Sequence, residues 1–321
     1  MSAMARTLGG FRAALWVGWI ALGVAGLGYA RLKGIPNWAA LPILAAFLIE
    51  YPFYLVAGFA AMRERLGGPA LPAFLVVSAT LPYLAAAPAI DFRWMALAQL
   101  AALALALGLW YRVLPVSALT DLGFLALVAS VYLFKFFDPI YPQVFKIRLS
   151  FLGHLTLIHL GVLVLTLERR IHETGYGFWP GWRDWRSGVV NYLYFLPVGA
   201  ALALGLHVVH PGAGAPLWLA PAIFFGMLWT VVLSEEFLFR GVLQEWLEEW
   251  TCPRWAALAL ASLAFGAVHL WFRGFPNWRW ALLTAALGWF CGRARNQAGD
   301  IRAGMVTHAL AIATWMGFFA R

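Results

Sequence analysis

The sequence predicts an all-α fold, a polytopic transmembrane helical bundle of about eleven helices. Of its 321 residues, 63% are hydrophobic and only 12% are charged, which excludes both an ordinary soluble domain and a disordered chain. Only helices and closed β-barrels satisfy the backbone in lipid, and a spanning helix needs about 20 apolar residues. The apolar runs of this chain are continuous rather than alternating, which favours helices over a barrel.

Eleven apolar runs are expected to span the membrane. The first follows Arg6 and Arg12 as in a signal peptide, but its apolar stretch is longer than the roughly 7–15 residues of a typical h-region. We therefore expect it to remain as a helix. The expected spans are residues 12–30, 38–62, 69–90, 94–111, 115–134, 151–168, 189–209, 217–240, 255–272, 280–296 and 301–320.

The distribution of positive charge predicts the orientation. If the N-terminus is cytoplasmic and eleven spans alternate sides, 14 of the 23 Lys and Arg residues fall on the cytoplasmic side. Because positive charge favours cytoplasmic loops, we expect a cytoplasmic N-terminus and a multi-pass position in the cell (inner or cytoplasmic) membrane. The net charge of +9 is spread over the loops without a basic stripe, which predicts membrane lipid as a partner and excludes nucleic acid.

A polar interval rich in Gly and Pro, residues 169–187, separates two unlike halves. We expect an accessory N-terminal transmembrane region of about six helices over residues 1–168 and a functional core over residues 175–321. Neighbouring helices should satisfy the isolated polar groups of the N-terminal half. These groups are Glu50, Asp121, His154 and His159.

Two adjacent acids, Glu235 and Glu236, lie with Arg240 at the end of an apolar run. A charge at the membrane centre costs roughly 2.5–3.5 kcal/mol on insertion scales, so such residues suggest a functional site. Glu236 and Arg240 have the i,i+4 spacing of an ion pair on one helix face, whereas Glu235 is rotated by about 100°. If the two carboxylates lie in different environments, the one paired with Arg240 could be structural and the other could be reactive. Alternatively, all three charges only pair with one another and with neighbouring helices.

The eighth and ninth spans are expected to form a hairpin with its turn at Thr251-Cys252-Pro253, because proline readily ends a helix. Glu235 lies 17 residues before the turn centre and His269 lies 17 residues after it. In an antiparallel pair the two residues therefore meet at one depth, about 25 Å from the turn. The eighth helix should continue to about Trp250, with its polar residues 244–249 in water.

Three motifs follow one another in the C-terminal half. They are Glu-Glu-x-x-x-Arg at 235–240, Phe-x-x-x-His at 265–269, and His308 in a helix that follows Gly299-Asp300-Ile301. In order and spacing they resemble the CPBP family of intramembrane proteases, which comprises the type II CAAX prenyl endopeptidases and their bacterial relatives. The resemblance covers roughly residues 175–321, and Trp182-Arg183-Asp184-Trp185 looks like the family's first segment.

This resemblance implies hydrolysis of a peptide bond within the membrane by a glutamate. We expect no cofactor, with zinc as the alternative. The substrate would be a membrane-embedded or membrane-tethered protein or peptide. Glu235 matches the catalytic acid, which polarises a water together with His269. Glu236 and Arg240 match the supporting pair, and His308 matches the histidine that stabilises the oxyanion.

One position departs from the family pattern. The family commonly carries Asn four residues after the third-motif histidine, where this chain has Ile312. Because Ile cannot donate a hydrogen bond, the oxyanion would depend on His308 and a further donor, for which Thr307 or a backbone N–H is available. Loss of one such donor commonly costs on the order of 10²–10³ in rate.

Four other functions are compatible with parts of the sequence. A zinc protease could use one Glu and two His as metal ligands. Its activity would be lost on treatment with a chelator. Cys252 and Cys291 are not expected to be ligands, because they lack metal-ligand spacing. A serine protease is disfavoured because Ser187 and Ser234 lack a Gly-x-Ser-x-Gly context. A non-catalytic immunity or scaffold protein would explain Ile312. A transporter could couple ions through polar groups of the N-terminal half, but no inverted repeat supports it.

Overall fold

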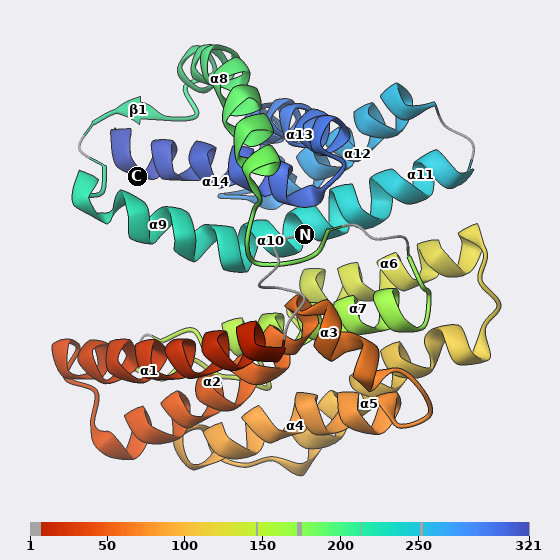
Figure 1. The fold of residues 1–321 in the computed structure, drawn as a ribbon. Helices are drawn as coiled ribbons and strands as arrows, with labels where there is room; N and C mark the ends of the chain where they lie inside the picture. The colour runs from red at the N-terminus through yellow and green to blue at the C-terminus, as the bar shows by residue number, and fades with distance from the viewer. Residues whose placement is uncertain (1–7, 146, 172–174, 213, 251–252, 321) are drawn as a thin grey trace. The chain divides into compact units, whose positions relative to one another are not determined.

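The computed structural model describes residues 8–145, 147–171, 175–212, 214–250 and 253–320. The chain divides into two compact units, an N-terminal unit within residues 3–172 and a C-terminal unit within residues 173–321 (Figure 1). Both are built of helices, as the sequence predicts, and a short antiparallel pairing of β1 (His210–Pro211) with β2 (Phe319–Ala320) is the small exception.

In the N-terminal unit, α2 packs against α1, α4 and α7, and α4 also packs against α5. Prolines interrupt both α2 and α4 without ending them, which is common in membrane helices because neighbouring groups can satisfy the freed backbone. The helices are α1 (Leu8–Leu32), α2 (Asn37–Gly58), α3 (Ala60–Arg63), α4 (Leu71–Ile90), α5 (Trp94–Val113), α6 (Ala118–Leu133) and α7 (Ser150–Leu167).

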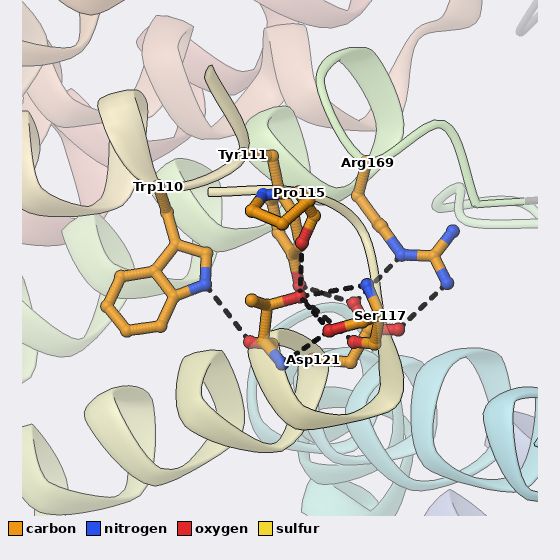
Figure 2. Close-up of polar contacts among 7 residues, drawn as sticks. Trp110, Tyr111, Pro115, Ser117, Asp121 and Arg169 are labelled. Atoms are coloured by element: carbon orange, nitrogen blue, oxygen red, sulfur yellow. Dashed lines mark hydrogen bonds and ion pairs between the residues drawn. The ribbon is translucent and has the colours of Figure 1, made fainter. Parts of the chain in front are cut away.

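A buried carboxylate joins α5, α6 and the segment that follows α7. Asp121, fully buried in the first turn of α6, accepts hydrogen bonds at 2.9 Å from the Tyr111 hydroxyl and at 2.8 Å from two nitrogens of Arg169 (Figure 2). The turn before α6 is fixed by a capping box between Ser117 and Thr120, which satisfies otherwise unpaired backbone groups. The expectation that neighbouring helices satisfy Asp121 is confirmed.

In the C-terminal unit, α13 packs against α8, α12 and α14, and α14 also packs against α8 and α9. The run from Ala220 to Trp250 is helical throughout, with π-helical turns at Leu228–Val232 and Phe237–Leu243. The helices are α8 (Trp182–Gly205), α9 (Ala220–Met227), α10 (Leu233–Glu236), α11 (Gln244–Trp250), α12 (Arg254–Val268), α13 (Trp278–Ala298) and α14 (Ile301–Phe318).

The start of α14 is held firmly in place. Gly299 adopts φ +76° at the end of α13, a conformation that glycine accepts without steric cost, and Asp300 then caps α14 by accepting from the backbone N–H of Arg302 at 2.9 Å. The Arg302 side chain also pairs with Asp300, lies 3.7 Å from Asp184 of α8, and donates to the carbonyl of Trp179 at 2.9 Å. These contacts fix the position of the first turn of α14 relative to α8 and to Trp179.

Each of the eleven expected spans contains a helix. Among the described residues, eight helices are long and apolar enough to cross a membrane, so the chain is a multi-pass membrane protein. Helix α6 is shorter, with 16 residues, while α13 and α14 are long enough but carry more polar residues. Of these three helices, α13 and α14 contribute Gly288, Gly304 and His308 to the polar centre described below.

The helical run that follows the acid pair ends at Trp250, as the hairpin arithmetic predicts. Thr251 and Cys252 of the expected turn lie outside the described residues. The expectation that residues 244–249 extend into water is wrong in part, because Gln244 is fully buried and donates to Asn296 at 2.9 Å. Glu248 accepts from Arg295 at 3.1 Å, so α13 satisfies this polar end.

Candidate active site

The two adjacent acids lie in different environments. Glu236 is fully buried, while the side chain of Glu235 is 30% exposed. Both belong to α10, which is enclosed by the π-helical turns. Such turns occur frequently at functional sites. The structure therefore separates the two carboxylates as the sequence suggests, one within the protein and one open to its surface.

Glu236 is the centre of a buried charged cluster. Its Oε1 lies 3.4 Å from a guanidinium nitrogen of Arg240 and 2.9 Å from Nδ1 of His308. The guanidinium of Arg240 also lies over the ring of Phe265, 4.5 Å from its centroid. Since breaking a buried ion pair leaves an uncompensated charge, each member of this cluster fixes the others.

Glycines make room for the cluster. A Cβ at Gly288 of α13 would lie 2.8 Å from a guanidinium nitrogen of Arg240, and a Cβ at Gly304 of α14 would lie 2.6 Å from Oε2 of Glu236. Both distances are shorter than real Cβ contacts. Small residues allow membrane helices to approach closely, and here they leave space for polar side chains between the backbones.

His308 connects the two acids. Because the carboxylate of Glu236 accepts a hydrogen bond, Nδ1 of His308 carries the proton of that contact, and Nε2 faces the other acid. This Nε2 lies 3.7 Å from Oε2 of Glu235. The side chain of His308 is only 5% exposed, so its orientation is set by the protein. The imidazole of His308 thus lies between the buried Glu236 and the partly exposed Glu235.

His269 lies at the C-terminal end of α12. Its Nδ1 donates to the carbonyl oxygen of Phe265 at 2.8 Å, which leaves Nε2 available to a substrate or a water. The ring of Phe265 stands edge-on to both His269 and His308, at 4.9 and 5.4 Å between centroids. Within the described residues, Glu235 and His269 share no hydrogen bond or ion pair. The direct partner of Glu235 is His308.

The structure changes the expectation for Thr307. Its hydroxyl is fully buried and donates to the carbonyl of Gly188 at 2.9 Å, with the carbonyl of Ala303 at 3.3 Å. Thr307 therefore joins α14 to α8 and is not free to replace the family's Asn as an oxyanion donor. Ile312 is only partly buried and offers no donor.

No role was expected for Cys291, which the structure places in the cluster. Ligand atoms of Cys291, Glu236 and His308 all lie within 4.8 Å of one another, and all three residues are buried. Thiolate, imidazole and carboxylate are donors that zinc accepts. However, Oε1 of Glu236 already contacts His308, and Arg240 would face the cation at short range. The residues fit an ion-paired cluster better than a metal centre.

Comparison with known proteins agrees with the motifs. Residues 216–314 match the family model described as Rce1-like, type II CAAX prenyl endopeptidase. No curated protein and no solved structure matches the chain. The matched segment contains both acids, Arg240 and both histidines. The resemblance drawn from the three motifs is confirmed, and it supports a protease that acts in a membrane.

Proposed function

We propose that the C-terminal unit is a glutamic intramembrane endopeptidase in which Glu235 activates a water. The observation that carries the proposal is the arrangement of the two acids around His308. A partly exposed carboxylate lies 3.7 Å from Nε2, while Nδ1 is fixed by a buried carboxylate that pairs with Arg240. A reactive group oriented by a second, buried group is the arrangement expected of a catalytic centre.

In the proposed reaction, Glu235 accepts a proton from a water as the water oxygen attacks the carbonyl carbon of the scissile peptide bond. A tetrahedral intermediate forms, and Glu235 returns the proton to the leaving nitrogen as the C–N bond breaks. One water is consumed, and the products are a new carboxyl terminus and a new amine. Such proton transfer contributes typically 10²–10⁴ in rate.

The two histidines would hold the water and the oxyanion. His269 presents Nε2 because its Nδ1 donates to Phe265, so it can orient the water beside Glu235. When His308 carries a proton on each nitrogen, Nε2 donates to the oxyanion while Nδ1 stays on Glu236. Arg240 and Glu236 are positioning residues that act through His308.

No metal has a place in this proposal. Of the Glu236, Cys291 and His308 group that could offer ligand atoms to a metal, Glu236 is already engaged by Arg240 and His308. The zinc alternative predicts loss of cleavage with a chelator and its recovery with added zinc.

The substrate class follows from the surroundings of the site. Glu235 lies in a helical run of 31 residues that is apolar enough to span a membrane, so the scissile bond must reach it from a membrane-embedded or membrane-tethered protein or peptide. The family match adds a prenylated protein as a candidate. Phe265 and the histidines select no particular lipid anchor.

The test compares new protein termini in membranes of cells that produce the wild-type protein or Glu235→Gln. Glu249→Gln serves as the matched control, because it makes the same chemical change at an exposed residue of the same helical run. Termini that depend on Glu235 but not on Glu249 support the proposal and identify the substrate. Equal sets of termini with all three proteins contradict it.

A second candidate function is a non-catalytic scaffold that retains the protease fold. The observation that favours it is the lack of a side-chain donor one turn beyond His308, since Ile312 is apolar and Thr307 is engaged by Gly188. If termini are unchanged while a partner protein co-purifies equally with wild type and Glu235→Gln, the scaffold is the better account.

A further inference from the structure

A second polar centre lies in the N-terminal unit, where three helices bring Glu50, Ser78 and His159 together. Nδ1 of His159 lies 2.7 Å from Oε1 of Glu50, and Nε2 lies 2.9 Å from the hydroxyl of Ser78. All three residues are fully buried. Glu50 comes from α2, Ser78 from α4 and His159 from α7. No sequence motif indicated that these residues meet.

The hydrogen bonds define an order among the three groups. An ionised Glu50 can only accept, so Nδ1 of neutral His159 carries the proton and Nε2 is left as the acceptor that faces Ser78. The hydroxyl of Thr156 lies 3.1 Å from Oε2 of Glu50 and 3.1 Å from the carbonyl oxygen of Leu152, so it can donate to the carboxylate or to the backbone. A hydroxyl, an imidazole and an orienting carboxylate in this order form the arrangement that activates a serine nucleophile. The hydroxyl has one competing acceptor, the carbonyl of Leu75 at 2.9 Å.

A spare hydrogen-bond donor lies in the same unit. The hydroxyl of Tyr141 is buried and has no hydrogen-bond partner among the described residues. The ring of Tyr141 packs edge-on against Tyr83 at 5.9 Å. Burial and the nearby Glu50 carboxylate raise the pKa of Tyr141, so its hydroxyl remains protonated. Buried polar groups are rarely left unpaired, and a phenol can donate to an oxyanion.

An apolar groove lies beside the polar centre. Phe53 is one of its lining residues, and the ring of Phe53 also lies 6.0 Å from the ring of His159. Phe53 therefore belongs both to the wall of the groove and to the surroundings of His159. Hydrocarbon is the chemistry that suits the lining. The groove has a volume of about 520 Å³ and is lined by Trp19, Ala45, Leu48, Ile49, Pro52 and Phe53.

We propose that Ser78, His159 and Glu50 form a second hydrolytic centre that acts on an acyl ester of a membrane lipid. Ser78 Oγ bonds to the acyl carbon, and its proton passes through Nε2 of His159 to the alcohol that leaves as the ester C–O bond breaks. Water then releases the fatty acid, and Ser78 regains a proton. The hydrocarbon chain occupies the groove, and Phe53 separates it from the centre at rest.

The experiment treats the full-length protein in lipid nanodiscs with a long-chain alkyl fluorophosphonate and locates the adduct by mass spectrometry. The expected result is a phosphonate on Ser78, formed as the Oγ–P bond replaces the P–F bond. Glu50→Gln should slow labelling by about 10²–10⁴, the range for loss of proton-transfer assistance. Glu235→Gln should label like the wild type, since that acid belongs to the other unit.

Ser130 is the matched internal control. It lies in the same unit, and its hydroxyl donates to the carbonyl of Leu127 at 2.7 Å and has no histidine partner among the described residues. The decisive readout is made on the folded wild-type chain, so it does not depend on whether a variant folds. An unlabelled Ser78, or equal labelling of Ser78 and Ser130, would overturn the proposal and leave a purely structural network.

Discussion

Gly304→Ala provides a sharp test of the buried cluster, because it adds one methyl group beside one carboxylate oxygen. The new Cβ would lie 2.6 Å from Oε2 of Glu236, whereas ordinary contact begins at 3.4 Å. The neighbouring carbonyl of Cys291, at 3.1 Å, is backbone and yields little. The carboxylate must therefore retreat by roughly 0.8 Å, which lengthens its 2.9 Å contact with His308.

The expected effect is larger on activity than on stability. Alanine is favoured over glycine in a helix by about 0.5–1 kcal/mol, and overpacking costs about 1–3 kcal/mol, so the net loss of stability should not exceed about 2.5 kcal/mol. A misplacement of about 1 Å can cost on the order of 10² in rate. Cleavage should thus fall by about 10- to 100-fold while the protein still folds.

Gly226→Ala is the control, since a Cβ at that position of α9 meets nothing within 4 Å. The assay measures the cleavage rate of the substrate that depends on Glu235, together with thermal unfolding of each variant. If Gly304→Ala cleaves as fast as Gly226→Ala, the placement of Glu236 by His308 is not important for the reaction, and the reasoning is refuted.

Three further predictions concern the same unit. Arg240→Gln should lower the stability to unfolding by about 3–5 kcal/mol, because it leaves Glu236 buried without its cation; an unchanged unfolding temperature would contradict this. Thr307→Val should cost about 1 kcal/mol in stability through loss of the bond to Gly188 and should leave the cleavage rate within about twofold; a loss of 10²-fold would instead make Thr307 an oxyanion donor. Because the proposed reaction uses no metal, treatment with excess chelator should remove no metal from the protein and should leave the cleavage rate unchanged. A loss of cleavage that added zinc restores would favour the zinc alternative.

Apolar run length predicted the helices well because lipid imposes that length on any spanning segment. The symmetric spacing of Glu235 and His269 about the hairpin turn also predicted that the eighth helix continues to Trp250. Whether its polar residues 244–249 are exposed to water was harder to predict. Gln244 is buried because Asn296 of α13 lies beside it, and sequence spacing within one helix carries no information about its neighbour.

The same distinction holds for the site. The ion pair of Glu236 with Arg240 is local, and its i,i+4 spacing predicted it. The contact of Glu236 with His308 depends on how α14 is rotated about its axis, which the sequence leaves open. That rotation brings His308 to the acids and turns the adjacent Thr307 towards Gly188. The meeting of Ser78 with His159 likewise depends on packing between distant helices.

The central claim is that Glu235 is the general base, and the most direct measurement is the cleavage rate of purified Glu235→Gln beside the wild type. Both proteins should have the same helix content and unfolding temperature, because the side chain of Glu235 is partly exposed and its close partner among the described residues is His308, at 3.7 Å. The account predicts a loss of at least about 10² in rate. A folded Glu235→Gln protein that cleaves at the wild-type rate would contradict it.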